Sequence, residues 1–249
     1  MSEVASLVDD LEAEQRILQD FVRDIGIDDW FAPTPAWGWD VRDTISHLAD
    51  IDEMAVATVH DAPGAINNVA ARSASGEDTT YRGVLAGRKL DGKSVLAWWE
   101  RNAAIEREVL LAADPAARIA WGIGMRAPSL VTARLMETWA HGLDVYAALS
   151  EEPTDTDRLA HVAWLATRAL PYAYSVAGED PPTPPMRVEL TLPSGAPWTY
   201  GPADAADRIT GTASDYCRVF VQRRPVADTT LVAEGDAARS ALRVARAYL

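Results

Sequence analysis

Hydrophobic residues recur every three or four positions in four long stretches of the first 150 residues. This period is typical of helices with one apolar face, and it predicts helices over residues 3–25, 41–59, 93–113 and 128–149. Asp40 stands at the N-cap position of the second stretch, where its carboxylate can accept a backbone hydrogen bond. Because no alternating strand pattern separates these stretches, they predict a four-helix bundle.

The pattern changes in the last hundred residues. A fifth helical stretch, 157–176, is followed by the proline-rich segment EDPPTPP, which is typical of a linker. The alternating segments RVELTL and PWTYG flank Pro193-Ser194-Gly195 and predict a β-hairpin. A helix over 203–222, a short strand over 230–233 and a last helix over 236–248 complete a small α+β unit.

We therefore expect a mainly α protein with two domains, a helical bundle over residues 1–152 and an α+β domain over 153–249. One long segment, 60–92, is rich in Gly, Ala, Ser and Asn and has no sustained period. Its length predicts a functional loop or lid, which we expect near the mouth of a pocket.

Composition narrows the class of protein and of partner. The 249 residues are 48% hydrophobic and 24% charged, with no apolar run long enough for a membrane span. The net charge of -14 disfavours nucleic acids and anionic membranes, which need clustered basic residues, and it leaves small molecules as the leading partners. The N-terminus lacks the pattern of a secretory signal, and a single cysteine, Cys217, permits no internal disulfide, so we expect a cytoplasmic protein.

A candidate metal site lies in the segment TARLMETWAHGLDVYAAL. Glu137 and His141 are four residues apart and share one face of a predicted helix, close enough to bind one ion. Flanking apolar residues predict that this face points into the bundle, where a third ligand would come from another helix. His47 is the best candidate. The alternative is an ordinary Glu-His pair on a helix surface beside a histidine packed in the core.

Several segments, RLMETWAHGLDVYAAL, PAWGWDVRDTISHLADID, SDYCRVFVQRR and ADTTLVAEGDAARSAL, resemble the mycothiol-dependent maleylpyruvate isomerase family of the DinB-like superfamily. The resemblance covers essentially the whole chain. It is nearest to an actinobacterial subgroup whose C-terminal domain sometimes carries a wyosine-base-formation label. It implies a DinB-like four-helix bundle, a smaller C-terminal domain, and a divalent metal, usually zinc, bound by His47, Glu137 and His141.

Three protein ligands leave one position of a tetrahedral zinc open, as in catalytic sites. The resemblance implies mycothiol as the cosubstrate, activated as a thiolate that adds to a small electrophile in an S-transferase or a cis-trans isomerase. A metal-dependent hydrolase or lyase that uses water without a thiol is the alternative, and a non-catalytic metal-binding or dimerisation protein is a further one. We expect a monomer or a homodimer.

Other residues are assigned by position or by the resemblance. Arg134 lies three residues before Glu137 and could bind a substrate carboxylate, or could neutralise Glu137 and Asp144. Asp50 could hold an imidazole in one tautomer, as an outer partner of a metal ligand does. Trp37 and Trp39 could wall the pocket. The resemblance implies an arginine from the C-terminal domain at the active site, with Arg223 and Arg224 as the candidates.

Overall fold

A computed structural model describes residues 3–60, 81–121 and 124–247 of the chain. These residues form two compact units, Met1–Pro153 and Thr154–Leu249, which we call the helical unit and the α+β unit. Among the described residues, no helix has both the length and the apolar character needed to cross a membrane.

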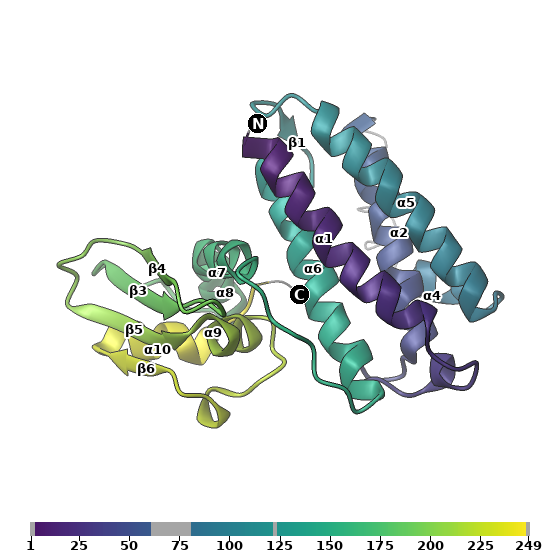
Figure 1. Ribbon diagram of the computed structural model, residues 1–249. Coiled ribbons are helices and arrows are strands. Elements are labelled where there is room, and N and C mark those ends of the chain that lie inside the picture. Colours follow the sequence, from purple (N-terminus) through teal and green to yellow (C-terminus); the bar gives the residue numbers. More distant parts are fainter. Residues whose placement is uncertain (1–2, 61–80, 122–123, 248–249) are drawn as a thin grey trace. The chain divides into compact units, whose positions relative to one another are not determined.

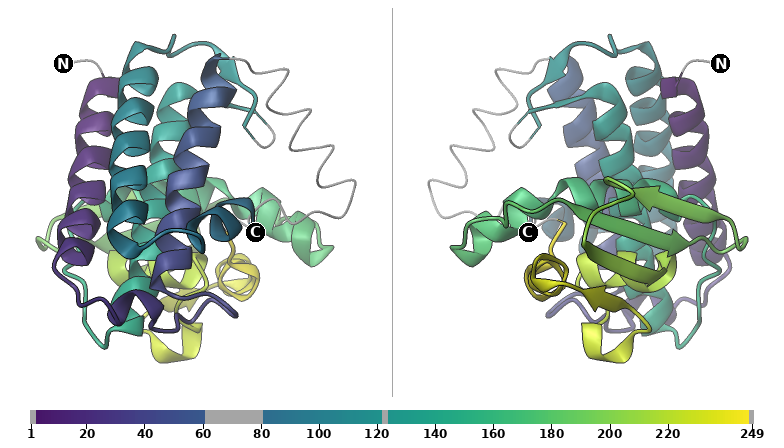
Figure 2. Two further views of the ribbon diagram at one scale, coloured as in Figure 1. Left: turned by 90° about the vertical axis from the view of Figure 1, so that its right-hand side faces the viewer. Right: turned by 90° about the vertical axis from the view of Figure 1, so that its left-hand side faces the viewer.

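The helical unit is built from four long helices that run side by side (Figures 1 and 2). They are α1 (Glu3–Arg23), α2 (Val41–His60), α5 (Gly92–Ala112) and α6 (Ala127–Ala148). Helices α1 and α2 each pack against both α5 and α6, which closes the bundle. The mainly α fold predicted from the hydrophobic period is therefore confirmed.

Shorter elements connect the long helices. A 3-10 turn, η1 (Asp29–Phe31), precedes α2, and α4 (Tyr81–Gly87) precedes α5. Strands β1 (Arg118–Ile119) and β2 (Met125–Arg126) form a two-residue antiparallel pair just before α6.

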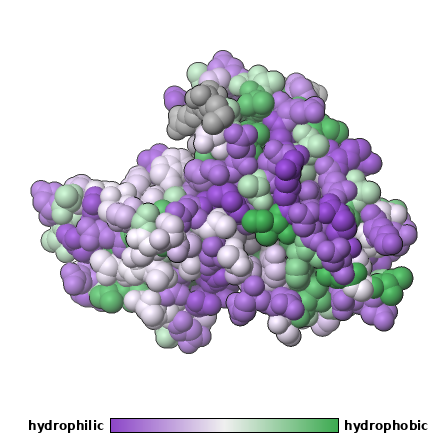
Figure 3. All heavy atoms as spheres, in the orientation of Figure 1, coloured by the Kyte–Doolittle hydropathy of each residue, from purple (hydrophilic) through white to green (hydrophobic). Residues whose placement is uncertain are grey.

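The core of the helical unit consists of the apolar faces of its helices. On the face drawn in Figure 3, hydrophilic residues dominate the surface and hydrophobic ones occur singly or in small groups. Burial of the apolar stripe is what stabilises such amphipathic helices in water. The central cluster contains Leu18, Val22, Trp30, Val41, Ile45, Leu48, Ala49, Val95, Leu96, Trp99, Ala103 and Val145.

Helix α4 lies within the segment 60–92, for which a long loop was predicted. The first part of that segment, residues 61–80, lies outside the described residues, and so does the expectation of a lid there. Helix α4 itself packs closely on α2 because it carries two glycines. A Cβ atom at Gly87 would overlap the Ser46 side chain, and one at Gly83 would come within 2.8 Å of the Ser46 carbonyl oxygen.

The α+β unit begins with α7 (Leu159–Arg168) and α8 (Leu170–Ala177), where a single helix over 157–176 was predicted. The helix is interrupted at Ala169. Pro171 in the first turn of α8 has no N–H to continue the hydrogen-bond ladder, and its ring restricts the residue before it.

A mixed sheet follows, in the order β4-β3-β5-β6. Strands β3 (Met186–Thr191) and β4 (Pro197–Tyr200) pair antiparallel, which confirms the predicted hairpin. Strand β5 (Asp207–Thr212) runs parallel to β3, and β6 (Val232–Glu234) pairs antiparallel with β5.

Helices α9 (Ala213–Phe220) and α10 (Asp236–Val244) and a 3-10 turn, η2 (Val226–Asp228), complete the unit. A helix was predicted over 203–222. The second half of this range contains α9, but residues 207–212 in the first half form β5 instead. The Thr212 hydroxyl accepts a hydrogen bond from the Asp215 N–H and so starts α9 at Ala213. Ile209, buried in the middle of β5, has polar neighbours on both sides, which is a strand pattern.

A charged cluster lies inside the helical bundle. The Arg134 guanidinium of α6 donates through Nη2 to Asp52 Oδ1 of α2 at 2.6 Å and through Nε to Glu106 Oε1 of α5 at 3.0 Å. Gln15 of α1 donates to Glu106, and Trp99 of α5 donates to Asp52. All four long helices therefore meet in one hydrogen-bonded network.

Replacing Arg134 tests how much this network stabilises the fold. Arg134→Ala leaves Asp52 and Glu106 buried without their cation, and we expect it to lower the free energy of unfolding by about 3–5 kcal/mol in urea denaturation. The control is Arg16→Ala, which removes an exposed ion pair with Glu12 and should change the free energy by less than ~0.5 kcal/mol. Equal losses in the two variants would contradict the importance of the network.

Candidate metal centre

Three side chains of the helical unit converge on one point. His47 comes from α2, and Glu137 and His141 come from α6. One ligand atom from each of them lies within 4.8 Å of the other two. His47 and His141 are 6% and 7% exposed, so the cluster is largely shielded from water.

The sequence brings the three residues together in two steps. On α6 the spacing of four residues places Glu137 Oε2 3.4 Å from His141 Nε2. The packing of α2 against α6 then brings the imidazole of His47 beside that of His141, with ring centroids 4.7 Å apart. The cluster predicted from spacing and resemblance is thus close in space.

Asp144 supports His141 from the other side. Its Oδ2 atom lies 3.5 Å from His141 Nδ1, and its side chain is 2% exposed. A carboxylate on one ring nitrogen favours a proton there and leaves the other nitrogen available as a ligand. Nε2, which faces Glu137, is therefore the nitrogen that could bind a metal.

The electrostatics of the cluster suit a cation. Burial raises the pKa of Glu137, but the hydrogen bond and charge of His141, with the charges of Arg134 and His47, outweigh burial and hold this pKa at about 2. Burial lowers the pKa of His141, but its hydrogen bonds to Asp144 and Glu137 raise it overall. A divalent ion here would replace the proton on His141 Nε2, the nitrogen that faces Glu137.

The donor set fits zinc. Two imidazole nitrogens and one carboxylate oxygen are the ligand types of catalytic zinc sites, and their mutual distance allows all three to contact one ion. The alternative of a solvated surface pair does not apply, because both histidines are buried and the Glu137 side chain is only 18% exposed.

The two candidate tryptophans differ. The Trp39 ring lies beside both imidazoles, with centroid distances of 5.0 Å to His47 and 6.2 Å to His141. Trp37, only two residues earlier, is 95% exposed. Within the helical unit, Trp39 is therefore the candidate that walls the cluster.

Two further candidates have other partners. Arg134, proposed to bind a substrate carboxylate or to neutralise Glu137 and Asp144, is 1% exposed and uses its guanidinium for two other acids, Asp52 and Glu106. Asp50 forms an ion pair with Arg82 of α4. Asp144 is the acid whose carboxylate lies near a ring nitrogen of His141. In the sequence, the spacing of three residues between His141 and Asp144 was the signal that could have indicated this contact.

The remaining candidates lie in the α+β unit. Arg224 donates to Asp215 at 2.8 Å, and Arg223 donates to the Val221 carbonyl oxygen at 2.8 Å. A role for either arginine at the metal centre stays a prediction. Cys217 is fully buried, and burial raises the pKa of its thiol well above the usual value.

Comparisons with known proteins identify the family of the chain. A family model described as the mycothiol maleylpyruvate isomerase N-terminal domain matches residues 11–146, more than half of the chain. The chain belongs to this family. The match includes all three residues of the candidate metal site.

Relatives extend the comparison to the full length. The chain is 37% identical over 249 residues to two proteins of Mycobacterium tuberculosis, the uncharacterized proteins MT0041 (strain CDC 1551 / Oshkosh) and Rv0036c (strain H37Rv), and it covers 97% of each. The crystal structure of the mycothiol-dependent maleylpyruvate isomerase matches with a TM-score of 0.59 and 13% identity over 92% of both chains. A mutant of that enzyme matches equally well. At this identity the structural likeness shows the fold alone.

Metal analysis tests the candidate site. We expect about one zinc ion per chain in protein purified without chelator, and His141→Ala should lose zinc on dialysis because the two remaining ligands lie on different helices. The control is His60→Ala, which removes an exposed histidine from the end of α2 and should leave the zinc content unchanged. A wild-type chain that stays free of zinc after zinc is supplied would rule out the site.

Proposed function

We propose that this protein is a zinc-dependent enzyme that activates mycothiol as a thiolate for addition to a small electrophile. The observation that carries the proposal is the buried His47, Glu137 and His141 cluster, in a chain that belongs to the mycothiol maleylpyruvate isomerase family. The three residues would hold the ion and leave one position of a tetrahedral site for the thiol.

Zinc, when bound, would supply the positive charge that stabilises a thiolate at neutral pH. The other contributions to the site would come from side chains of the protein itself. Glu137 brings a negative charge that is already present at neutral pH, since its pKa is about 2. Asp144 orients the His141 ring, and Trp39 shields one side of the imidazole pair from water.

The reaction begins when the sulfur of the thiolate forms a bond to an electrophilic carbon. In a transferase, the adduct gains a proton, keeps this sulfur-carbon bond and leaves as an S-conjugate. In a cis-trans isomerase, the electron pair of the carbon-carbon double bond moves to a conjugated carbonyl oxygen as an enolate, and rotation occurs about the resulting single bond. The enolate then returns its electron pair, which restores the double bond as the same thiolate leaves. Both outcomes need the same activation of the thiol, so the cluster supports the shared first step.

Dependence on pH tests the activation step. Activity of the wild-type chain with maleylpyruvate or a comparable electrophile should require mycothiol and should persist well below pH ~8.5, the pKa of an ordinary thiol, because the cation stabilises the thiolate. Steady-state rates between pH 6 and 9 measure this, with the His141→Ala variant as the control. An activity equal with and without mycothiol would contradict the proposal.

Replacement of the cysteine tests the source of the nucleophile. We expect Cys217→Ser to leave kcat and KM nearly unchanged, because the thiol comes from the cosubstrate and Cys217 is buried as a small apolar residue. The rates should be compared at equal zinc content and equal fold, checked by circular dichroism. A large loss of activity in a folded, zinc-loaded variant would assign the nucleophile to the chain.

A further inference from the structure

Trp39 reaches the metal centre from a short turn, so its position depends on what holds that turn. The Trp39 N–H donates to the Ala36 carbonyl oxygen at 3.0 Å, and the Thr34 N–H donates to the Trp39 carbonyl oxygen at 2.9 Å. Gly38 has a φ of 77°, a left-handed conformation that glycine adopts without strain. The turn therefore has a defined backbone shape.

The turn leads directly into α2 through a reciprocal cap. The Asp43 N–H donates to Asp40 Oδ1 at 2.7 Å, and the Asp40 N–H donates to Asp43 Oδ2 at 3.4 Å. This is the pattern of a capping box, in which the first residues of a helix satisfy each other's N–H groups. It fixes the start of α2 at Val41, six residues before His47.

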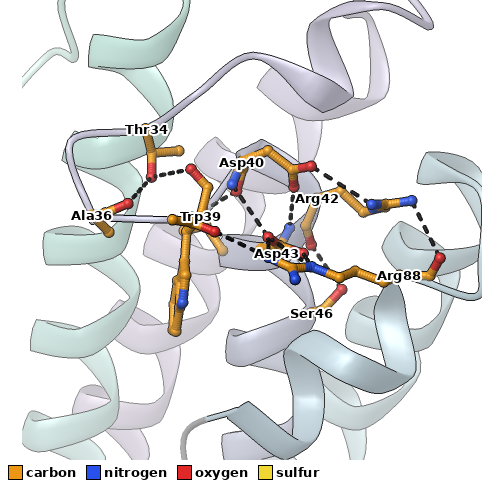
Figure 4. Close-up of polar contacts among 10 residues, drawn as sticks. Thr34, Ala36, Trp39, Asp40, Arg42, Asp43, Ser46 and Arg88 are labelled. Carbon is orange, nitrogen blue, oxygen red and sulfur yellow. Dashed lines mark hydrogen bonds and ion pairs between the residues drawn. The ribbon is translucent and has the colours of Figure 1, made fainter.

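Arg88 ties the turn and the cap together from a distant part of the sequence (Figure 4). Its guanidinium donates through Nε and Nη2 to the Asp43 carboxylate, at 3.0 Å and 2.6 Å, and through Nη2 to the Gly38 carbonyl oxygen at 3.0 Å. The Asp43 side chain is only 1% exposed and the Arg88 side chain is 38% exposed, so water reaches this ion pair from the arginine side alone. In Figure 4 the Trp39 ring points away from these contacts, along the helices.

We propose that Arg88 and Asp43 are positioning residues that hold the turn 36–39 on the start of α2 and thereby hold the Trp39 ring against His47 and His141. Any effect of Arg88 and Asp43 on the binding of a thiol at the metal centre rests on the function proposed above. Arg88 acts through Trp39, because its guanidinium contacts the turn and the cap while the Trp39 ring contacts the imidazoles.

Fluorine NMR tests the positioning without any enzyme activity. The full chain is labelled with 5-fluorotryptophan, and Trp39→Phe identifies the Trp39 signal among those of the nine tryptophans. We expect Arg88→Gln to move or broaden this signal in the metal-free chain and to reduce its response to added zinc. Arg23→Gln, which breaks an ion pair between α1 and α5, should leave the Trp39 signal in place.

Arg88→Lys is a second, milder variant, which keeps the test valid if Arg88→Gln does not fold. It keeps the charge but cannot form the forked contact with Asp43, so we expect a smaller displacement of the same signal. A Trp39 signal at the wild-type position, with the wild-type zinc response, in folded Arg88→Gln or Arg88→Lys would overturn the proposal. This result depends on neither mycothiol nor the electrophile, so it is separate from a failure of the proposed function.

A double-mutant cycle then tests whether Arg88 affects the KM for mycothiol through Trp39. Arg88→Gln should raise KM for mycothiol by about 10-fold in the wild-type background. In the Trp39→Ala background the same change should have no further effect, because the residue through which Arg88 acts is gone. Equal effects in both backgrounds, at equal zinc content, would overturn the role of Trp39 as the intermediary.

Discussion

The helical unit depends on the burial of one arginine. A guanidinium cannot lose its charge in a protein, so Arg134 inside the bundle requires carboxylates around it. Asp52 and Glu106 provide them, and Gln15 and Trp99 satisfy the remaining carboxylate oxygens. Because these partners come from the three other long helices, the contacts favour one rotation and one register for each helix. Purely apolar faces specify these features less strictly.

The charged network and the metal centre are neighbours with different electrostatics. Arg134 lies one turn before Glu137 on α6, and its charge contributes to the low pKa of Glu137. In the network, burial and the adjacent Asp52 raise the pKa of Glu106 well above its usual value. Beside Arg134, Glu106 of α5 thus resists ionisation, whereas Glu137, one turn later on α6, ionises readily and can serve a cation.

The sequence predicted those features that depend on local periodicity. The long helices follow the 3.6-residue period, and Glu137 with His141 follows from the i,i+4 spacing on α6. Strand β5 was missed because it is half-buried and because the residues after it are helical. Asp144 was not assigned to His141, since spacing alone does not tell which of several nearby acids points to a ring nitrogen. Arg88 and Asp43, 45 residues apart, meet only through the packing of α4 on α2.

The same carboxylate of Asp43 serves two purposes at the start of α2. It completes the capping box with Asp40, and it receives Arg88, which also contacts Gly38. Asp43 and His47 are four residues apart, so they lie on one face of the helix. The ion pair between Asp43 and Arg88 thus holds the turn that carries Trp39 at the start of the helix that carries His47. Helix α2 itself holds the backbone of His47, so the ion pair acts on the position of the Trp39 ring. A ring held in this way is in place before any ligand binds, as a preorganised site requires.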